Sequence, residues 1–548
     1  MNNVVLVGFM GSGKSTVGPH LAQRLKRPFV DLDDVIEADA GQSVAEIFSN
    51  EGEAGFRERE SRNLQGTLES DGVVVAVGGG APMREDNWAR IRDGNCVVAL
   101  TAEPTELARR LNGSTDRPLL QSGKASAIAT LLPSRLPRYL EADLVVKTDG
   151  LDPAEVAEQV KGRLSAGGLQ RIPIDVPGSP HEVTLGYGLT HLVPSAVRRL
   201  NPSAVGAGAS LKPSPVYGGG QGGSVLVVTD EHVERRAKPL MDALASDGIA
   251  AQLHVIPAGE AAKELSVLAG IYAALAAAGV DRQGALIALG GGSVGDVAGF
   301  AAATWMRGIR LIQMPTTLLA VVDSSIGGKT GVNLPAGKNL VGAVHQPCAI
   351  LCDLDYLGTL PEKEFRASFA EIIKAAVISD RQFFDWLRQN LSGLAGGRPP
   401  IVREAIVRAI AIKASVIGRD PNESGVRAVL NYGHTVAHAL ERAAGYGRLR
   451  HGEAVAWGME VAARISLRAG ACLPEAVELQ HGLLRDAGLL TGRPAIAHTK
   501  LIEAMRHDKK TWAGEPRWVL LREIGRAEYG QAVGASVVEA ALAEVLPE

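Results

Sequence analysis

Near its start the chain reads Val4-Val-Leu-Val-Gly8-Phe-Met-Gly-Ser-Gly13-Lys14-Ser15-Thr16, a short apolar run that leads directly into a glycine-rich loop. Such a β-branched run is typical of a strand buried in a parallel sheet. The loop has the pattern G-x-x-x-x-G-K-S. Backbone N–H groups of this pattern surround phosphate oxygens, its lysine brings charge to the terminal phosphates, and its serine can ligate Mg²⁺. The stretch therefore predicts an α/β domain with a parallel sheet and a nucleotide site, rather than a glycine turn that binds nothing.

Two aspartates follow the next apolar run and extend this site. Asp31 and Asp33 come directly after Pro28-Phe-Val30, at the carboxyl edge of the predicted sheet, where ligands bind. One carboxylate there can hold metal-bound water, and another can accept the proton of an acceptor hydroxyl. Asp33 can also cap the following helix, and the two roles are compatible. The pattern indicates a kinase that uses ATP and leaves the acceptor open.

Further motifs complete this region, and they occur in the order Gly52-Glu-Ala-Gly-Phe56-Arg57-Glu-Arg-Glu60, Gly78-Gly79-Gly80, Arg117-Pro118 and Arg135-Leu-Pro-Arg138-Tyr139. With the loop, they resemble shikimate kinase over the whole region. The resemblance implies that shikimate is the acceptor, held by Asp33, Arg57, Gly79, Gly80 and Arg135. Arginine forks suit a carboxylate substrate, and a carboxylate suits vicinal hydroxyls.

The nucleotide side of this site is expected to include two further arginines. Arg117 lies in a polar loop that we interpret as a lid over the phosphates, and Arg110 is expected against the adenine. A solvated surface position is the alternative for each. The expected ATP contacts are Gly11, Ser12, Gly13, Lys14, Ser15, Thr16, Arg110 and Arg117. Ser15 and Asp31 are expected near Mg²⁺, and Lys14, Asp33 and Arg117 are expected to act in catalysis.

A second module follows the flexible joint Ser165-Ala-Gly-Gly168. Val225-Leu-Val-Val-Thr-Asp230 predicts a buried strand that ends in an acid, and Leu286-Ile-Ala-Leu-Gly290-Gly-Gly-Ser-Val-Gly295-Asp296 predicts a strand, a glycine turn and a helix. Such a turn can bind a pyrophosphate, and Asp230 can accept a ribose hydroxyl. Because the pattern is not G-x-G-x-x-G, it favours a dinucleotide only moderately.

Three histidines suggest a metal site further on. His434 and His438 are four residues apart, which places both on one face of a helix, and His451 can return to the same place from the next helix. No Glu follows His434, so the zinc-protease pattern is absent. A surface or core position is the alternative for such a pair.

The surrounding motifs are more specific, and they are Val322-Asp323-Ser-Ser-Ile-Gly-Gly328-Lys329, Gly337-Lys338-Asn339, Ala370-Glu371-Ile-Ile-Lys374, Arg427-Ala-Val-Leu-Asn431-Tyr-Gly-His434, His451-Gly-Glu453 and Asp508-Lys509-Lys510. They resemble 3-dehydroquinate synthase over the whole module apart from residues 201–223. The resemblance implies a catalytic Zn²⁺ (or Co²⁺) held by Glu371, His434 and His451, three protein ligands with room for substrate. It places His438 toward the substrate.

The same resemblance implies a cofactor site and a substrate site. The implied NAD contacts are Asp230, Glu260, Lys263, Gly291, Gly292, Asp296, Thr316, Thr317, Asp323, Lys338 and Asn339. The implied contacts to 3-deoxy-arabino-heptulosonate 7-phosphate are Arg307, Lys329, Lys374, Lys413, Arg427, Asn431, His438 and Lys509, with Arg307 reaching in from a partner subunit. Lys329, Lys374 and His438 are expected to be catalytic. The implied reaction uses NAD as a recycled oxidant, eliminates phosphate and closes a ring to 3-dehydroquinate.

Length and composition are compatible with this organisation. We expect a P-loop kinase domain at 1–166, a linker at 167–170, a Rossmann-like α/β NAD-binding domain at 171–354 with a flexible insertion at 201–223, and an α-helical metal-binding domain at 355–548. A net charge of −3 gives no indication that the chain binds nucleic acid or a membrane. Four scattered cysteines and no long apolar run predict a cytoplasmic protein. A homodimer through the second module is implied by the resemblance.

Two other interpretations compete with this one. The second module could be a metal-dependent polyol dehydrogenase, which shares its architecture but does not need the phosphate-binding cluster of Lys413, Arg427 and Lys509. Alternatively, one module could serve only as a scaffold or regulatory domain for the other. Because Lys14, Asp33 and all three metal ligands are present, we expect both modules to be active.

Overall fold

The chain forms two compact units in the computed structural model, which describes residues 3–111, 124–165, 169–199, 224–335, 337–445, 448–506, 511–512 and 515–546. The first unit holds Met1–Leu169 together with Gly186–Leu192, and the second holds Gln170–Leu185 together with Val193–Glu548. The predicted insertion at 201–223, Arg117 and Lys509 lie outside the described residues. Within the described ranges, no helix is both long and apolar enough to cross a membrane.

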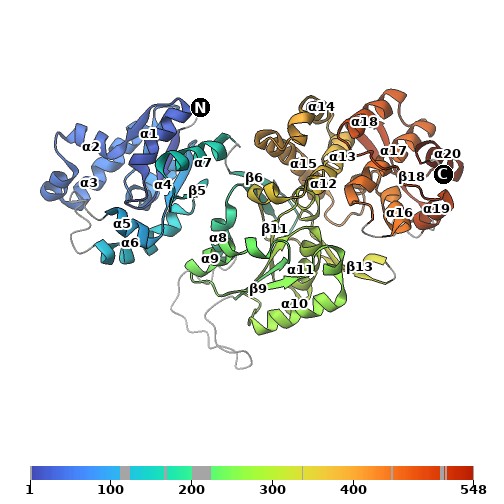
Figure 1. Cartoon of the computed structure of the whole chain (residues 1–548), viewed down its shortest axis with the longest axis horizontal. Helices are drawn as coiled ribbons and strands as arrows, with labels where there is room; N and C mark the ends of the chain where they lie inside the picture. Colours follow the sequence, from blue (N-terminus) through green and yellow to red (C-terminus); the bar gives the residue numbers. More distant parts are fainter. Residues whose placement is uncertain are drawn as a thin grey trace. The chain divides into compact units, whose positions relative to one another are not determined.

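The first unit is built on a five-stranded parallel sheet with the strand order β2-β3-β1-β4-β5 (Figure 1). Its strands are β1 (Val4–Val7), β2 (Phe29–Asp31), β3 (Val74–Ala76), β4 (Cys96–Thr101) and β5 (Leu144–Lys147). Strand β1 lies in the centre, where Val5 pairs with Val75 on one side and Val97 on the other. All its residues are buried, which confirms the strand predicted from the apolar run.

Helices cover both faces of this sheet. They are α1 (Lys14–Leu25), α2 (Leu32–Ala40), α3 (Val44–Leu68), α4 (Glu85–Arg92), α5 (Pro104–Leu111), α6 (Lys124–Tyr139) and α7 (Pro153–Ser165), with the 3₁₀ turns η1 (Ala81–Met83) and η3 (Leu189–Leu192). On one face Leu6 packs with Leu21 of α1 and Val160 of α7. On the other face Val5 belongs to a cluster that includes Phe56 of α3.

The second unit contains a seven-stranded sheet with the order β6-β7-β14-β11-β10-β8-β9. Its strands are β6 (Gln170–Ile174), β7 (His181–Gly186), β8 (Val225–Asp230), β9 (Ala251–Ile256), β10 (Ala285–Gly290), β11 (Arg310–Pro315) and β14 (Ala349–Asp353). Strands β9, β8, β10, β11 and β14 pair in parallel, while β6 and β7 form an antiparallel pair. A separate antiparallel hairpin is formed by β12 (Lys329–Leu334) and β13 (Gly337–Val344).

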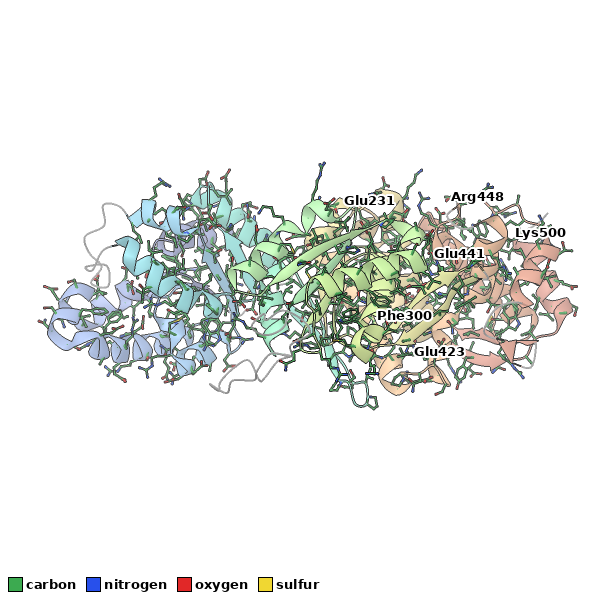
Figure 2. All side chains as sticks on the ribbon, turned by 90° about the horizontal axis from the view of Figure 1, so that it is seen from below. Glu231, Phe300, Glu423, Glu441, Arg448 and Lys500 are labelled. Atoms are coloured by element: carbon green, nitrogen blue, oxygen red, sulfur yellow. The ribbon has the colours of Figure 1, made fainter. Side chains whose placement is uncertain are left out.

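The helices of this α/β part include α11, which starts at the glycine turn after β10. The elements are α8 (Val193–Arg199), α9 (Lys238–Ser246), α10 (Leu265–Ala277) and α11 (Gly292–Thr304), with the shorter turns η5 (Glu234–Arg236), η6 (Gly259–Lys263), η7 (Trp305–Arg307) and η8 (Ala320–Ser324). Phe300 of α11, labelled in Figure 2, packs against the core that holds Leu286 of β10. The predicted Rossmann-like arrangement of strands and helices is confirmed.

Helices dominate after β14, as predicted. They are α12 (Glu362–Ala367), α13 (Phe369–Ser379), α14 (Arg381–Ala395), α15 (Pro399–Arg419), α16 (His434–Ala444), α17 (His451–Arg468), α18 (Pro474–Asp486), α19 (His498–Arg506) and α20 (Ala535–Val545), with the 3₁₀ turns η9 (Leu354–Thr359) and η10 (Val426–Asn431). Two small antiparallel pairs join them, β15 (Thr511–Trp512) with β16 (Glu515–Pro516), and β17 (Trp518–Glu523) with β18 (Arg526–Gln531). The division between the α/β and helical domains near residue 354 stays a prediction.

One expected helix is divided. The residues from 362 to 378 have a helical pattern that favours one continuous helix, but Ser368 separates α12 from α13. The Ser368 hydroxyl donates a hydrogen bond to the carbonyl of Glu364 (2.9 Å), which competes with regular helix continuation. At the break, the carbonyl of Ala367 lies against Gly452 of α17, where a Cβ would stand only 1.8 Å from that oxygen.

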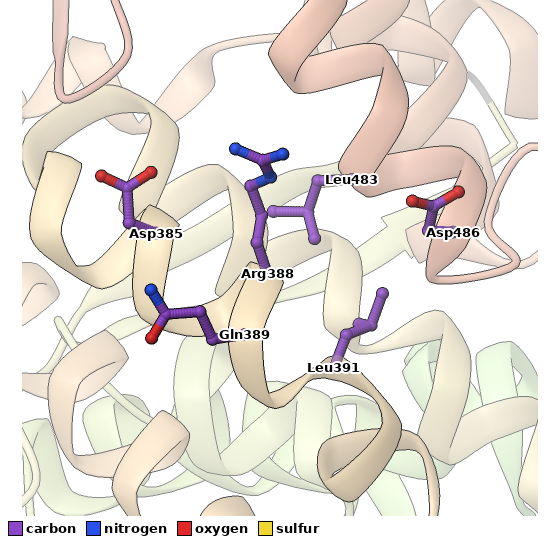
Figure 3. A pocket seen from close by; sticks show the side chains of 6 residues that line it. All are labelled: Asp385, Arg388, Gln389, Leu391, Leu483 and Asp486. Atoms are coloured by element: carbon purple, nitrogen blue, oxygen red, sulfur yellow. The ribbon is translucent and has the colours of Figure 1, made fainter.

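A polar hollow opens between α14 and α18 (Figure 3). Its volume is about 460 Å³, and its lining residues are Asp385, Arg388, Gln389, Leu391, Leu483 and Asp486. No residue predicted for a cofactor, metal or substrate lines this hollow.

Two glycines allow α16 and α17 to approach closely. Gly433 precedes α16 with a φ of 78°, a left-handed conformation that favours glycine. A Cβ added to Gly458 of α17 would lie 2.1 Å from the carbonyl oxygen of Gly433. Because His434 is the first residue of α16 and His451 the first of α17, this contact fixes the distance between the two histidines.

Gly458→Ala is expected to destabilise the second unit by about 1–3 kcal/mol, because the added methyl overpacks the contact between α16 and α17. The measurement is the midpoint of urea unfolding followed by tryptophan fluorescence. Gly482→Ala is the matched control, since no atom lies within 4 Å of a Cβ at that helical glycine. The control should be neutral or slightly more stable, by up to about 1 kcal/mol. Equal stability of Gly458→Ala and the unchanged protein would contradict the close contact.

Candidate active sites

The phosphate-binding loop of the first unit lies between β1 and α1. Gly8, Gly11 and Gly13 have φ values of 143°, 80° and 101°, in the region that favours glycine. The ammonium of Lys14 donates hydrogen bonds to the carbonyl oxygens of Gly8 (2.9 Å) and Phe9 (3.2 Å). The lysine therefore folds back over the loop at the N-terminus of α1, where phosphate oxygens are bound in such loops.

Arg110 is held beside this loop. Its guanidinium donates hydrogen bonds to the hydroxyl (2.9 Å) and the carbonyl (2.7 Å) of Thr148, and it pairs with Glu106 at 2.7 Å. A longer hydrogen bond reaches the carbonyl of Gly11 at 3.5 Å. The structure thus brings Arg110 to the nucleotide loop, and its contact with an adenine stays a prediction.

Asp31 and Asp33 occupy different places: Asp31 caps α2, and Asp33 faces the acceptor turn. Asp31 precedes α2, and its Oδ1 accepts a hydrogen bond from the backbone N–H of Asp33 at 3.2 Å. The capping role considered for Asp33 therefore belongs to Asp31, because Asp33 already lies in the first turn of the helix. The Asp33 carboxylate instead faces the triple glycine, with its Oδ1 3.4 Å from the position of a Cβ on Gly78.

The predicted acceptor residues meet around this glycine turn. The Arg57 guanidinium lies on Gly80, where a Cβ would be 2.3 Å from Nη2. The hydroxyl of Tyr139 donates to the carbonyl of Gly79 at 2.5 Å, and burial raises the pKa of Tyr139 to about 12. Arg135 hydrogen-bonds the same tyrosine. Asp33, Arg57, Gly79, Gly80 and Arg135 are therefore brought together.

Glu60 belongs to this group, although sequence reasoning assigned it no role. Its Oε2 accepts a hydrogen bond from Arg57 Nη1 at 2.7 Å, one helical turn away on α3. Its Oε1 is buried without a hydrogen-bond partner. Burial raises the pKa of Glu60, and Arg57 opposes that rise. The signal was present in the motif, because Arg57 and Glu60 have the (i, i+3) spacing of a helical ion pair.

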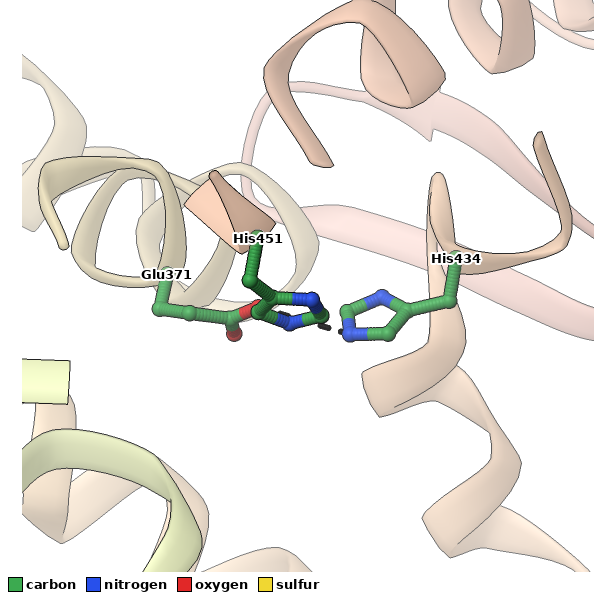
Figure 4. A group of neighbouring side chains, drawn as sticks. All are labelled: Glu371, His434 and His451. Carbon is green, nitrogen blue, oxygen red and sulfur yellow. Dashed lines mark ion pairs between the residues drawn. The ribbon is translucent and has the colours of Figure 1, made fainter. Parts of the chain in front are cut away.

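Three side chains from three helices converge in the second unit (Figure 4). His434 Nε2 lies 3.4 Å and His451 Nε2 3.6 Å from the same oxygen, Glu371 Oε1. That oxygen is buried, and both imidazoles face it. Among the described residues this is the one group of His, Cys, Asp or Glu side chains with the spacing of a metal site. Two imidazoles and a carboxylate are a donor set that zinc accepts at catalytic sites, so the residues fit the predicted ion.

The positive groups around Glu371 keep its carboxylate ionised, as a metal ligand must be. Burial opposes its ionisation, but Lys374 and His434 outweigh burial and hold the pKa of Glu371 well below the usual range. Lys374 forms an ion pair with Glu371 Oε2. His438 lies one turn after His434 on α16, with ring centroids 5.6 Å apart. His438 is thus beside the ligand group without belonging to it.

Both histidine ligands have a partner for their other ring nitrogen. His434 Nδ1 lies 3.3 Å from the carbonyl of Tyr432, and His451 Nδ1 lies 3.6 Å from Glu441 Oε1. Burial disfavours the charged form of His451, yet hydrogen bonds to Glu371 and Glu441 raise its pKa to about 10. Metal-binding histidines are commonly oriented by such contacts. Glu441 lies on α16 with His434 and was given no role from the sequence.

The predicted dinucleotide residues gather at the carboxyl ends of β8, β10 and β11. Gly291 caps α11, and a Cβ on it would lie 3.2 Å from Thr317. Lys263 is buried and pairs with Asp296 at 2.5 Å. The backbone N–H of Thr316 donates to the carbonyl of Gly290 at 3.0 Å. Gly292 starts α11 beside Ser324.

Asp230 also lies at this edge, at the end of β8. Its Oδ1 accepts hydrogen bonds from the backbone N–H groups of His232 (2.9 Å) and Val233 (3.1 Å). The carboxylate therefore stabilises the turn that follows the strand. A hydrogen bond from a ribose hydroxyl would be accepted by Oδ2 of Asp230. This contact stays a prediction.

The β12–β13 hairpin connects the dinucleotide side to the helical part through two lysines. Lys338 lies 3.2 Å from Glu260 Oε1 and 3.9 Å from Glu441 Oε1. Asn333 donates to Glu260 at 2.7 Å and accepts from the backbone N–H of Asn339 at 3.0 Å. These contacts place the predicted residues Glu260, Lys338 and Asn339 in one group.

The second hairpin lysine, Lys329, forms an ion pair with Glu423. Glu423 also accepts a hydrogen bond from Asn431 Nδ2 at 2.6 Å. Its φ of 57° is unusual for a residue other than glycine and marks a strained position in the loop before η10. The sequence assigned Glu423 no role, yet it joins two residues predicted to bind substrate.

The remaining predicted cations lie nearby. Lys413 of α15 donates to the carboxylate and to the carbonyl (2.6 Å) of Asp323, and Arg427 donates to the carbonyl of Gly327 at 3.1 Å. Burial lowers the pKa of Lys413, although Asp323 opposes the change. A cavity of about 10 Å³ touches Asp323, Glu371, Lys374 and Lys413, so little open space remains beside these ion pairs.

Arg307 is exposed at the end of η7, the turn that follows α11. Met306 and Arg307 have φ values of 50° and 69°, two successive left-handed residues that are not glycine. Such strain is found where a residue must be presented in one orientation. The prediction that Arg307 reaches a partner's site is untested.

Asp420 anchors the loop that carries Glu423 and Arg427. Its Oδ1 accepts the backbone N–H of Ser424 (2.8 Å), and its Oδ2 accepts those of Gly425 (2.7 Å) and Arg427 (3.0 Å). Although desolvation acts in the opposite direction, these hydrogen bonds lower the pKa of Asp420 to about 2. The ionised carboxylate thus holds the loop in place.

Comparison with known families matches three regions of the chain. The shikimate kinase family matches residues 10–165. The N-terminal domain of 3-dehydroquinate synthase matches residues 253–367, and its C-terminal domain matches residues 368–511. Asp230 precedes these two ranges, whereas Glu371, His434 and His451, the predicted metal ligands, lie inside the last one.

Individual relatives agree with the family matches. A 3-dehydroquinate synthase from Xanthomonas campestris pv. campestris is 49% identical over 300 residues, which are 54% of this chain and 80% of that protein. The structure is similar to that of 2-deoxy-scyllo-inosose synthase complexed with carbaglucose-6-phosphate, NAD⁺ and Co²⁺, at 26% identity and a TM-score of 0.59, over 69% of this chain and 100% of the other. It is also similar to the structure of 2-epi-5-epi-valiolone synthase from Streptomyces hygroscopicus subsp. jinggangensis with NAD⁺ and Zn²⁺ bound. The identity is 27% and the TM-score 0.57, and the match covers 67% of this chain and 96% of the other.

Asp420→Asn is expected to lower the free energy of unfolding by about 1–3 kcal/mol at neutral pH, because an amide nitrogen would face backbone N–H donors. Since the folded state lowers this pKa from 3.8 to about 2, the contribution of Asp420 is complete above the ordinary value and is lost as pH falls through about 2. The difference between variant and unchanged protein should therefore shrink below pH 4. Urea unfolding across this range measures it.

The control for this measurement is Asp385→Asn, which removes a partly exposed ion pair with Arg381. It should change the free energy of unfolding by less than about 1 kcal/mol at any of these pH values. A loss in Asp420→Asn no larger than in this control would contradict the anchoring role.

Proposed function

We propose two reactions for this chain, which belongs to the 3-dehydroquinate synthase family and carries a shikimate kinase domain ahead of it. The first is the transfer of the terminal phosphate of ATP to shikimate, which gives shikimate 3-phosphate. The second converts 3-deoxy-arabino-heptulosonate 7-phosphate to 3-dehydroquinate and phosphate. The chain is thus a bifunctional enzyme, a phosphotransferase and a phosphate-eliminating lyase of aromatic biosynthesis.

In the first reaction, Lys14 and the loop glycines would hold the phosphates of ATP. Asp33 would accept the hydroxyl proton of shikimate, because its carboxylate faces the acceptor turn while Asp31 caps the helix. Arg57 and Arg135 would bind the shikimate carboxylate. Ser15 and Asp31 offer the oxygen ligands that Mg²⁺ prefers, and Mg²⁺ would offset charge on the phosphates.

The second reaction is supported above all by one observation. The Glu371, His434 and His451 group lies next to Lys374, and Lys413 and Asp323 line the same small cavity. A metal-ligating group beside buried ammonium groups suits a substrate with both hydroxyls and a phosphate. Neither the metal-ligating group nor the ammonium groups alone would distinguish this reaction from that of a polyol dehydrogenase.

When bound, Zn²⁺ or Co²⁺ would act as a Lewis acid on substrate hydroxyls, and NAD would accept a hydride and return it. Lys374, Lys413, Arg427 and the hairpin's Lys329 would orient the phosphate and offset its charge as it leaves. His438, beside the ligand group, would move a proton at the substrate. Asn431 would hold a substrate hydroxyl, and Lys509 would join the phosphate contacts.

Dinucleotide binding is proposed for the residues at the carboxyl ends of β8, β10 and β11. Gly291 and Gly292 would admit the pyrophosphate to the N-terminus of α11. The buried pair of Lys263 and Asp296, with Thr316 and Thr317, would line the same place. We also propose a homodimer through this module, in which the strained Arg307 contributes to the partner's substrate site.

Phosphate release from 3-deoxy-arabino-heptulosonate 7-phosphate tests the second reaction. The purified chain with NAD should release phosphate without net NADH, lose this activity on chelation, and regain it when Zn²⁺ or Co²⁺ is added. Accumulation of NADH would instead indicate a polyol dehydrogenase. His434→Ala should abolish phosphate release and keep shikimate phosphorylation, and Lys14→Ala should do the reverse. Loss of both reactions in one well-folded variant would contradict independent sites.

Gly80→Ala tests the acceptor site of the first reaction. The added methyl would displace the Arg57 guanidinium, which lies 2.3 Å from its position, so the KM for shikimate should rise at least about tenfold while the KM for ATP changes little. Steady-state kinetics measure both constants. Gly66→Ala, on the same α3 as Arg57 and with no atom within 4 Å, is the control and should keep both. An unchanged KM for shikimate in Gly80→Ala would place the acceptor elsewhere.

A further inference from the structure

Glu441 is a partly buried acid that none of the proposed steps uses. It lies near the end of α16, and its side chain is 12% exposed. Its Oε1 lies 3.6 Å from Nδ1 of His451 and 3.9 Å from Nζ of Lys338. One carboxylate oxygen therefore contacts both a proposed metal ligand and a proposed dinucleotide contact. Figure 2 labels Glu441 among the side chains of the second unit.

The contact with His451 determines how this imidazole can serve a metal. Its Nε2 faces Glu371 Oε1 at 3.6 Å, so the lone pair needed for a metal must be on that nitrogen. A hydrogen on Nδ1 donated to Glu441 gives this tautomer and fixes the plane of the ring. Loss of such a carboxylate typically weakens metal binding about 10–100-fold.

The contact with Lys338 leads to the dinucleotide side. Lys338 lies on β13 and pairs with Glu260 at 3.2 Å, and Glu260 accepts a hydrogen bond from Asn333, which in turn accepts one from Asn339. Lys338 thus stands between an acid of the α/β part and an acid of the helical part. Its position cannot change without changing the contacts of Glu441.

We propose that Glu441 is a positioning residue that couples metal binding at Glu371, His434 and His451 to dinucleotide binding beside Lys338. The inference rests on the proposed function. Ordering Glu441 through His451 also orders Lys338, so the second ligand meets a site that is already arranged. Coupling of this kind is reciprocal, and each ligand should tighten the other by the same factor, typically about 5–150-fold.

The experiment measures binding rather than turnover, with the full-length chain. Metal-free protein is titrated with Zn²⁺ in competition with a chromophoric chelator, with and without saturating NAD⁺. NAD⁺ is then titrated calorimetrically with and without Zn²⁺. The unchanged chain should show the same coupling factor in both directions.

Glu441→Gln keeps the shape and an acceptor oxygen but removes the charge. It should weaken Zn²⁺ about 10–100-fold and bring the coupling factor close to one. Lys338→Met should have the same Zn²⁺ affinity as the unchanged chain when NAD⁺ is absent. Its coupling factor should nevertheless fall close to one. Glu404→Gln, which removes a partly exposed pair with Arg408 on α15, is the control and should keep both quantities.

Three outcomes would overturn the proposal. They are a Zn²⁺ affinity in Glu441→Gln equal to that of the control, a coupling factor that persists in Glu441→Gln, and Zn²⁺ binding in the unchanged chain that does not depend on NAD⁺. Failure of the proposed function is recognised separately, because His434→Ala and the unchanged chain would then bind Zn²⁺ equally weakly.

Discussion

Glu371 places a carboxylate inside α13, where every residue from Phe369 to Ile378 is buried. Removing such a charge from water costs several kcal/mol unless partners surround it. Lys374, one turn further along the helix, supplies one partner, and His434 and His451 supply two more from α16 and α17. The packing of these three helices therefore depends on a single charge, and the glycine contacts let their backbones approach closely enough to meet it.

In the second unit, ion pairs connect the α/β part to the helical part, and each part supplies lysines to acids of the other. The hairpin lysines Lys329 and Lys338 reach acids of the helical part, whereas Lys413 of the helical part reaches Asp323 of the α/β part. Five of the cations proposed to bind substrate or dinucleotide already pair with an acid, and they are Lys263, Lys329, Lys338, Lys374 and Lys413. A ligand must therefore compete with internal carboxylates. The charge of these cations is thus balanced both with and without a bound ligand.

Local patterns were sufficient for the architecture and for much of the site. The loop from Gly8 to Gly13 is read directly from glycine spacing, and the positions of His434 and His451 follow from two helix starts. The acids Glu60, Glu423 and Glu441 were not assigned, because a carboxylate on a helix has no distinguishing pattern until tertiary contacts show its partner. The cap at Asp31 was missed for a related reason, since either neighbouring aspartate could begin α2. The break at Ser368 depends on a side-chain hydrogen bond that periodicity does not record.

The segment Gly186–Leu192 belongs to the first unit, although the residues before and after it belong to the second. His191 in this segment is buried, and its Nδ1 contacts the carbonyl of Gly188 at 2.6 Å. The polypeptide therefore passes from one unit to the other more than once. A gene split after residue 169 would therefore leave the segment Gly186–Leu192 of the first unit on the fragment that carries the second unit.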